Sequence, residues 1–249
     1  MIRFDAIILA GGRGSRLGGV DKGALTIGGR SLLDGVLEAT LAADQVVVVG
    51  DGPVPRGVLL TREDPVFGGP AAAVVAGLRA LRMPSSTSDP DPSEVRGRVG
   101  EPPGPGSPIG GHGMSPAPLV LVVACDLPEA AAGVLLLLGA ASRSASCGSV
   151  DPDEISATAR GAEGGIPGAL GAPPADGWCL ADEDGRRQWL FGLYRARALE
   201  RAAMALGNPA GRSMAQLLGG LDLLAVPAPA RIIMDIDTHD DVQRWRASN

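Results

Sequence analysis

The segment Ala6-Ile7-Ile8-Leu9-Ala10-Gly11-Gly12-Arg13-Gly14-Ser15-Arg16-Leu17-Gly18-Gly19-Val20-Asp21-Lys22-Gly23 joins an apolar strand candidate to a glycine-rich loop. It also contains the single lysine of a chain that has 21 arginines. A lysine ammonium approaches clustered phosphate oxygens as a point charge, whereas a planar guanidinium requires a different geometry. The segment therefore suggests phosphate chemistry, and the alternative is that Lys22 is an ordinary solvated side chain.

The overall composition describes a globular protein. The chain has 249 residues, 45% of them apolar, and a net charge of -6. The arginines are dispersed along the sequence, so we expect no nucleic-acid-binding face. Cys125, Cys147 and Cys179 include no close-spaced pair, which argues against a disulfide framework or a zinc site and favours a reducing compartment. No apolar stretch reaches the roughly 20 residues that cross a bilayer. We therefore expect a cytoplasmic protein that does not associate with a membrane.

The first part of the chain alternates strand and helix candidates. Strands are predicted at residues 4–10, 45–49, 58–61 and 119–124, because these runs are apolar and rich in β-branched residues. Helices are predicted at 31–43, 70–82 and 129–141, with Ser31 as a cap of the first and Pro70 in the first turn of the second. This alternation predicts an α/β fold with a mostly parallel sheet.

Two segments interrupt this pattern. Residues 84–117 and about 143–177 are rich in Pro, Gly, Ser and Ala and poor in large apolar side chains, so we expect disordered insertions within a single domain that spans 1–249. The second segment is followed by a predicted hairpin, 178–181 with 189–195, and by helices at 196–206 and 212–218. Further strands are predicted at 221–226 and 232–236, and Thr238 with Asp241 resembles a capping box of a last helix.

Polar residues follow several of the predicted strands. The glycine-rich loop ends the first strand, Asp51 follows the second, Asp126 follows the strand at 119–124, and Asp235 and Asp237 lie at the end of the last one. Ligands of open parallel sheets bind at the carboxyl ends of the strands, so this clustering predicts a binding site. A P-loop is excluded because Gly23 follows Lys22, and a dinucleotide fingerprint is excluded because Leu17 stands where the third glycine is needed.

Seven short motifs occur along the chain in a fixed order. They are Leu9-Ala10-Gly11-Gly12, Arg16-Leu17-Gly18-Gly19-Val20-Asp21-Lys22-Gly23, Glu63-Asp64, Gly69-Pro70, Ala124-Cys125-Asp126-Leu127-Pro128, Asp184-Gly185-Arg186-Arg187-Gln188 and Asp235-Ile236-Asp237-Thr238. Together they resemble the nucleotidyltransferase superfamily, in particular the molybdenum cofactor guanylyltransferases. The resemblance implies a single Rossmann-like, three-layer domain of the GT-A-like type. It also implies transfer of GMP from GTP to molybdenum-molybdopterin with release of pyrophosphate.

The resemblance implies a role for each matching residue. The main chain of Leu9, Ala10, Gly11 and Gly12 would contact the nucleotide, because glycine allows close approach of backbone amides to phosphates. Arg16 and Lys22 would neutralise the leaving pyrophosphate. Asp126 would hold Mg²⁺ as the cofactor, and Asp64 matches a further nucleotide-binding position. The acceptor's phosphate oxygen is already an anion, so no general base is required, and proteins of molybdoenzyme maturation are candidate partners.

Each of these residues has a plainer interpretation. Gly11 and Gly12 fit a tight turn, Arg16 fits a solvated side chain, and Asp64 fits a polar residue at the end of a strand. Asp126 is equally compatible with capping the helix that follows it, and Asp235 and Asp237 with capping the last helix.

The identity of the base is also open. Asp51 stands where related sequences often carry an asparagine-containing stretch, and its carboxylate could accept hydrogen bonds from guanine. The aspartates of Asp235-Ile236-Asp237 instead look like those of the cytidylyltransferases of the molybdenum cofactor, where Asp237 would be a second magnesium ligand. The alternatives are therefore a cytidylyltransferase, a sugar-phosphate nucleotidyltransferase, and a catalytically silent nucleotide-binding protein.

Overall fold

The computed structural model describes residues 2–11, 25–27, 29–83, 118–147, 175–236 and 238–247. Within these residues the main feature is a seven-stranded sheet with the order β5-β4-β1-β6-β8-β7-β9. Its strands are β1 (Phe4–Ala10), β4 (Val46–Gly50), β5 (Leu59–Thr61), β6 (Leu119–Ala124), β7 (Gly177–Ala181), β8 (Arg187–Arg195) and β9 (Leu223–Pro227). Neighbouring strands are parallel except where β8 pairs with β6 and β7, so the expectation of a mostly parallel sheet is confirmed.

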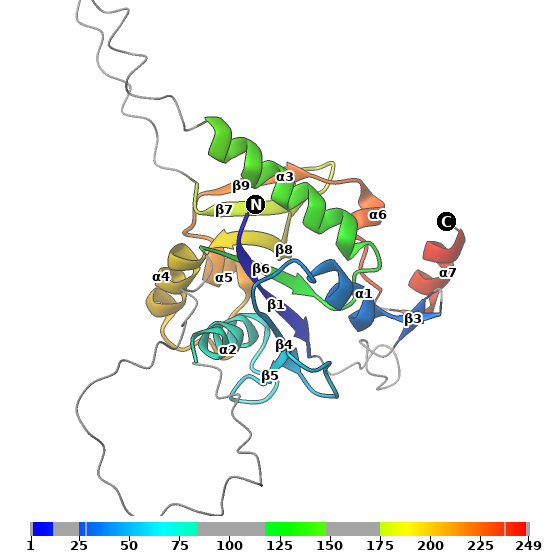
Figure 1. Ribbon diagram of the computed structural model, residues 1–249, viewed down its shortest axis with the longest axis horizontal. Coiled ribbons are helices and arrows are strands. Elements are labelled where there is room, and N and C mark those ends of the chain that lie inside the picture. Colours follow the sequence, from blue (N-terminus) through cyan, green and yellow to red (C-terminus); the bar gives the residue numbers. More distant parts are fainter. Residues whose placement is uncertain are drawn as a thin grey trace, which may run out of the picture.

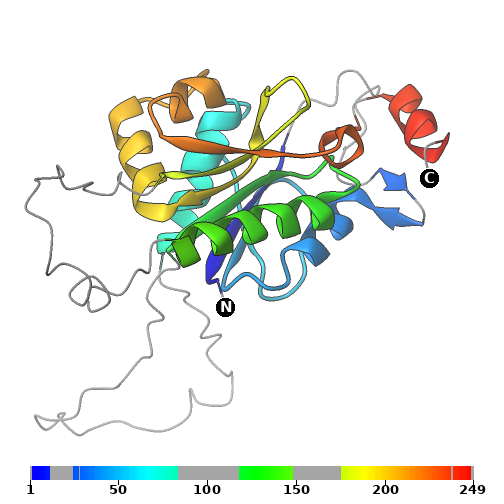
Figure 2. The ribbon, with the colours of Figure 1, turned by 90° about the horizontal axis from the view of Figure 1, so that it is seen from above.

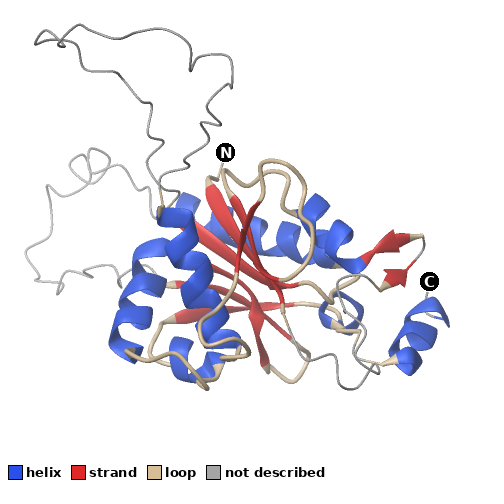
Figure 3. Ribbon diagram, turned by 90° about the horizontal axis from the view of Figure 1, so that it is seen from below, coloured by secondary structure: helices blue, strands red, loops and turns tan. Residues whose placement is uncertain are grey.

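Helices cover both faces of the sheet (Figures 1 and 2). One face packs against α1 (Leu32–Ala39), α3 (Ala130–Cys147) and α6 (Ala230–Ile233), and the other packs against α2 (Pro70–Arg82), α4 (Ala196–Leu206) and α5 (Met214–Leu218). Strand β1 shows why both faces are apolar: Ala6 and Ile8 belong to one cluster, while Ile7 and Leu9 belong to the other. Successive side chains of a strand point to opposite faces, and burying both gives the three-layer α/β arrangement in Figure 3.

The predicted caps are present. Ser31 is the N-cap of α1, and its side chain accepts a hydrogen bond from the backbone N–H of Asp34 at 3.0 Å. At the start of the last helix, α7 (His239–Ala247), the hydroxyl of Thr238 accepts from the N–H of Asp241 at 3.2 Å. The Asp241 carboxylate in turn accepts from the N–H of Thr238 at 2.7 Å, so the reciprocal capping box is confirmed.

Some predicted helix ends and one predicted element type were wrong. Helix α1 ends at Ala39, where Thr40 is the C-cap, rather than at residue 43. Helix α3 continues to Cys147 and so includes the first residues of the segment 143–177 that was predicted to be loose, and most of that segment, like residues 84–117, lies outside the described residues. In place of the strand predicted at 232–236, Ile232 and Ile233 end the single helical turn α6 after Pro229, and residues 234–236 belong to neither a helix nor a strand. A short apolar run does not by itself distinguish helix from strand.

A small apolar cluster lies beside the main sheet. Ile27 and Ile236 are buried there, with Val242 and Trp245 of α7 packed against them. Ile27 comes from β2 (Thr26–Ile27), which pairs antiparallel with β3 (Arg30–Ser31). In Figure 1 the arrowheads of β1 and β6 point toward the side that carries β3 and α7. No helix in the described part of the chain has the length and apolar character needed to cross a membrane.

Candidate functional site

The carboxyl ends of the central strands bring several predicted site residues to one edge of the sheet. In the register of the sheet, Ala10 of β1 lies opposite Gly50 of β4, and Leu9 lies opposite Ala124 of β6. The N–H of Cys125 donates to the carbonyl oxygen of Leu9 at 3.0 Å, which ties the chain before Asp126 to the end of β1. Gly11, Asp51 and Asp126 therefore follow three adjacent strands, as the sequence predicted.

Gly50 allows the backbones of β1 and β4 to lie unusually close. A Cβ atom at this position would be 2.8 Å from the carbonyl carbon of Ala10 and 3.1 Å from the N of Gly11. At Gly11 itself a Cβ would meet no described atom closer than 3.7 Å, the carbonyl oxygen of Val49. Packing among described residues thus requires glycine at Gly50 but not at Gly11, where a requirement for glycine would have to come from a ligand or from the adjoining loop.

Asp51 and Asp64 lie on the outer part of this edge, after β4 and β5. The Asp51 carboxylate forms an ion pair with Arg62 at 2.7 Å, and the Arg62 guanidinium lies 5.5 Å from the centre of the Phe67 ring. The Asp64 side chain is exposed, whereas the preceding Glu63 is buried and accepts a hydrogen bond from the N–H of Phe67 at 3.1 Å. No sequence motif indicates that Arg62 pairs with one oxygen of Asp51.

Asp126 lies where this edge meets a large cleft. The cleft has a volume of about 990 Å³ and is open to solvent. It is lined by the start of α2, the end of β6, the β7–β8 hairpin, the start of α5, β9, α6 and the segment before α7: Pro70, Ala124, Asp126, Leu127, Asp182, residues 185–191, residues 213–215, Ala225, Ile233 and Asp235. Leu9, Gly11, Asp51 and Asp64 are not among the described residues that line it, so Asp126 joins two adjacent regions.

Asp235 is a site residue that sequence reasoning noted but did not select as a metal ligand. The N–H of Ile236 donates to the carbonyl oxygen of Asp126 at 3.0 Å, and the Ile236 side chain is fully buried. This contact holds the Asp-Ile-Asp segment against the end of β6, and the Asp235 side chain shares the cleft with Asp126. The alternation of Asp235 and Asp237 around an apolar residue was the available signal, but the contact is between distant parts of the sequence.

The helix-capping alternatives for Asp126 and Asp235 receive no support from this geometry, and Asp237 lies outside the described residues. Helix α3 begins at Ala130, so Asp126 lies outside its N-cap position. At α7 the capping hydroxyl belongs to Thr238, which leaves Asp235 available to the cleft. Asp126 and Asp235 offer hard carboxylate oxygens, as Mg²⁺ prefers. No group of three or more His, Cys, Asp or Glu side chains suited to a metal occurs among the described residues.

The far wall of the cleft is the turn between β7 and β8. One oxygen of the Asp182 side chain accepts from the N–H groups of Asp184 and Arg186, at 3.1 Å and 2.7 Å. The main chain closes the same turn, because the N–H of Asp182 donates to the carbonyl of Arg186, and the N–H of Gly185 donates to the carbonyl of Asp182. Gly185 has a φ of 77°, a conformation that favours glycine. The turn is therefore a rigid support for Arg186.

Beneath this wall, Cys179 and Tyr194 are buried in the sheet. Burial raises the pKa of the Cys179 thiol to about 11, and its Sγ lies 3.1 Å from the carbonyl oxygen of Gln188. Burial likewise raises the pKa of Tyr194, whose hydroxyl donates to the carbonyl of Trp189 at 2.9 Å. A protonated, buried thiol is a poor nucleophile, so these residues serve packing rather than chemistry.

Four predicted site residues lie outside the described residues: Gly12, Arg16, Lys22 and Asp237. The described part of the predicted nucleotide site therefore consists of Leu9, Ala10, Gly11, Asp51, Asp64 and Asp126. Leu9 is buried, Ala10 is partly buried and Gly11 is exposed, so the chain emerges from the core where the glycine-rich loop begins.

The fold is that of nucleotidyltransferases, and solved structures of low sequence identity share it. Molybdopterin-guanine dinucleotide biosynthesis protein A of Archaeoglobus fulgidus has a TM-score of 0.54 and 15% identity, covering 98% of this chain and 97% of that one. The 2-C-methyl-D-erythritol 4-phosphate cytidylyltransferase of Francisella tularensis has a TM-score of 0.57 and 13% identity, covering 100% of both chains. A Mycobacterium tuberculosis protein in complex with manganese has a TM-score of 0.55 and 13% identity, covering 99% of both.

The model of the MobA-like NTP transferase domain matches residues 6–221, and the chain belongs to that family. Among curated proteins it is 37% identical over 83 residues to a molybdenum cofactor guanylyltransferase of Cereibacter sphaeroides. That match covers 31% of this chain and 42% of the relative, so the chain spans less than half the length of the curated relatives it matches. The resemblance inferred from the motifs is thereby confirmed.

Proposed function

We propose that this protein transfers GMP from GTP to the phosphate of molybdenum-molybdopterin. The observation that carries the proposal is the position of Asp126, between the ends of β1 and β4 on one side and the open cleft on the other. A nucleotide on the first side and an acceptor in the cleft would meet at this carboxylate. The curated relative named molybdenum cofactor guanylyltransferase supports this choice of acceptor and nucleotide.

The nucleotide side would act mainly through the main chain. Backbone groups of Leu9, Ala10, Gly11 and Gly12 would contact the triphosphate, because glycine leaves N–H groups accessible to phosphate oxygens. Arg16 and Lys22 would add positive charge where pyrophosphate leaves. Lys22→Ala is expected to abolish turnover without unfolding the protein, and near-normal rates would contradict this assignment.

The carboxylates of the site fit a divalent cation. Asp126 would hold Mg²⁺ together with a carboxylate of the Asp-Ile-Asp segment, either Asp237 or the cleft-lining Asp235. Mg²⁺ is commonly bound through one or two carboxylates plus phosphate oxygens, and when bound it offsets charge that develops on the phosphates. The fold neighbour in complex with manganese is consistent with a divalent ion at such a site.

The reaction would need alignment more than proton transfer. An oxygen of the acceptor phosphate forms a bond to the α-phosphorus of GTP, and the bond from that phosphorus to the bridging oxygen breaks, which releases pyrophosphate. The attacking oxygen is an anion at neutral pH, so a general base is unnecessary. The protein's contribution is to hold the attacking oxygen, the phosphorus and the leaving oxygen in line.

The fold does not distinguish between guanine and cytosine as the base of the nucleotide, since a cytidylyltransferase has the same fold. Asp51, with one oxygen toward Arg62, would accept hydrogen bonds from guanine through the remaining carboxylate positions. Asp64 would contact the nucleotide from the neighbouring loop. We propose the cytoplasm as the location, and proteins of molybdoenzyme maturation as partners that receive the product.

Pyrophosphate release tests the proposal directly. Purified protein is incubated with Mg²⁺, molybdenum-molybdopterin and either GTP or CTP, and a sugar phosphate serves as a second acceptor. We expect turnover with GTP and molybdenum-molybdopterin. Turnover with CTP but not GTP would favour the cytidylyltransferase alternative. Nucleotide binding without turnover of any pair would favour a catalytically silent protein.

A further inference from the structure

The charged side chains that line the cleft differ in the contacts that they make with other residues of the protein. Among the described residues, the carboxylates are Asp126, Asp182 and Asp235, and the guanidinium groups are those of Arg186 and Arg187. The Asp182 carboxylate is used within its own turn, where it accepts two backbone hydrogen bonds. Under the proposed function, Asp126 and Asp235 face the metal, which leaves the two arginines to interact with an acceptor's negative charge.

The two adjacent arginines have different environments. The Arg187 guanidinium donates to the carbonyl oxygen of Leu223 at 3.1 Å and lies 5.6 Å from the centre of the Trp189 ring. Arg187 therefore extends along the sheet and is held there by two contacts. The Arg186 guanidinium has no hydrogen bond or ion pair to any residue that the structure describes, although it lines the same cleft and is exposed.

The backbone of Arg186 is nevertheless firmly held. Its N–H donates to the Asp182 carboxylate at 2.7 Å, and its carbonyl accepts from the N–H of Asp182 at 3.1 Å. A charged group on a fixed backbone loses less freedom on binding than one on a flexible loop. Arginine also presents a planar set of donors that matches two phosphate oxygens at once.

We propose that Arg186 binds the phosphate monoester of the acceptor and so contributes to acceptor specificity. This inference rests on the proposed function, because it assigns the acceptor end of the same cleft. Arg186 would hold non-attacking oxygens of that phosphate, while the remaining oxygen faces the α-phosphorus near Asp126. A neutral hydroxyl acceptor or water would form only weaker hydrogen bonds with the guanidinium, so the residue favours a phosphate.

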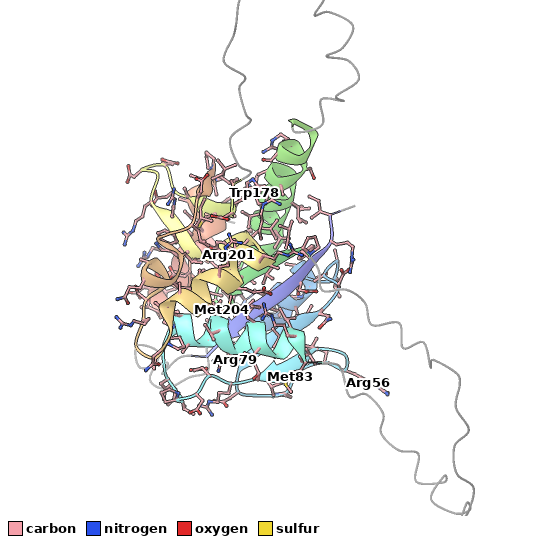
Figure 4. All side chains as sticks on the ribbon, turned by 90° about the vertical axis from the view of Figure 1, so that its left-hand side faces the viewer. Arg56, Arg79, Met83, Trp178, Arg201 and Met204 are labelled. Atoms are coloured by element: carbon pink, nitrogen blue, oxygen red, sulfur yellow. The ribbon has the colours of Figure 1, made fainter. Side chains whose placement is uncertain are left out.

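Kinetics of matched variants test the assignment. Arg186→Gln removes the charge and keeps a polar side chain of similar length, whereas Arg186→Lys keeps the charge without the planar donors. Arg79→Gln is the control, since Arg79 is an exposed arginine on α2, on the face of the molecule shown in Figure 4 and outside the cleft. The KM values for molybdenum-molybdopterin and for GTP are measured for each protein.

We expect Arg186→Gln to raise the KM for molybdenum-molybdopterin by about 10- to 100-fold, the usual scale for losing a charged hydrogen bond, and to leave the KM for GTP within about twofold. Arg186→Lys should recover part of the loss, and Arg79→Gln should match the wild type. An unchanged acceptor KM in Arg186→Gln, or an equal rise in both KM values, would overturn the inference.

A binding measurement separates this inference from the proposed function. Phenyl phosphate, a monoester with a flat ring, is titrated into wild type, Arg186→Gln and Arg79→Gln while backbone NMR shifts are recorded. We expect shifts around residues 182–191 in wild type and Arg79→Gln, and loss of these shifts in Arg186→Gln. This result would support the phosphate site even if GTP turnover were absent. Equal binding by all three proteins, or no binding by the wild type, would overturn it.

Discussion

The two halves of the sheet present different kinds of groups at the strand ends. In the half formed by β5, β4, β1 and β6, all pairs are parallel, and main chain and carboxylates meet at one edge. In the half formed by β8, β7 and β9, an antiparallel hairpin extends beside that edge and lines the cleft with side chains. Under the proposed function, the first half binds the feature common to all nucleotides, and the second distinguishes acceptors.

This difference has a physical basis. Phosphate oxygens are recognised well by backbone N–H groups, which a glycine-rich loop after a buried strand supplies whatever the neighbouring side chains are. An acceptor must instead be distinguished from other molecules, which requires particular side chains. Changes to the glycine-rich loop in the parallel half should therefore impair binding of any nucleotide, changes at Asp51 should alter the choice of base, and changes in the hairpin should alter the choice of acceptor.

The largest effect is expected where the halves meet. Asp126→Asn should lower kcat on the order of 10²- to 10³-fold, because a bound metal contributes several kcal/mol to the transition state. Asp44→Asn is the control, since Asp44 pairs with Arg3 at 2.8 Å in the loop that leads into β4, away from the cleft. Initial rates and thermal unfolding are measured for both. Comparable rates for the two variants would remove Asp126 from the site.

The second largest effect is expected at Gly50, where β1 and β4 approach each other closely. Gly50→Ala should destabilise the protein by about 1–3 kcal/mol, because the new Cβ would lie 2.8 Å from the backbone of Ala10 and force the strands apart. It should also weaken binding of GTP and CTP alike, since the glycine-rich loop starts here. Gly35→Ala in α1, where a Cβ has open space, should stabilise by about 0.5–1 kcal/mol.

Denaturant unfolding and nucleotide titration check this pair of variants. Equal stability of Gly50→Ala and Gly35→Ala would show that the strands adjust without cost. A loss of affinity for GTP only would show that Gly50 acts through the base-binding Asp51 beside it and not through the glycine-rich loop.

A smaller effect is expected from the hairpin. Asp182→Ala removes the acceptor of two backbone hydrogen bonds, which is worth about 1 kcal/mol for a partly exposed turn. The turn should become more mobile, so the KM for the acceptor should rise several-fold while the KM for GTP stays constant. Steady-state kinetics with each substrate varied in turn give both values, and a selective effect on GTP would reverse the proposed assignment of the two halves.

The smallest effect concerns the core beneath the hairpin. With its pKa raised to about 11, the Cys179 thiol stays protonated at pH 8, and alkylation by iodoacetamide should be very slow in the folded protein. The unfolded thiol, with a pKa near 9.0, loses its proton first as pH rises. Stability should therefore be unaffected below pH 9 and should fall between pH 9 and 11. Peptide mapping after labelling, with and without urea, measures the protection, and rapid labelling without urea would contradict burial.

Local sequence patterns were enough to predict most elements of the fold. The helix from Pro70 to Arg82 was predicted at its observed bounds, because a glycine pair, a proline in the first turn and a stripe of small residues all agree there. Residues 232–236 were mispredicted because two isoleucines between polar and proline residues fit either a strand or a turn of helix. Packing against α3 and the sheet decided between them.

The candidate site likewise contains features that the sequence predicted and features that it did not. Asp126 was predictable because it directly follows a buried strand in a parallel sheet, and that position alone directs it to the binding edge. The ion pair of Asp51 with Arg62 and the contact of Ile236 with Asp126 were not predictable, since each joins segments whose separation in space depends on the whole fold.

The sequence by itself determined the class of fold, the family, and the strand-end positions of Gly11, Asp51 and Asp126, because hydrophobic periodicity and short motifs act over a few residues. Only the tertiary structure decided that Asp235 shares a cleft with Asp126 and that Arg187 is held by Trp189 and Leu223. It also decided that the guanidinium of Arg186 lines this cleft without a hydrogen bond or ion pair to any residue in the described part of the chain. These features arise from contacts between side chains brought together by the sheet order, which no local pattern of the chain encodes.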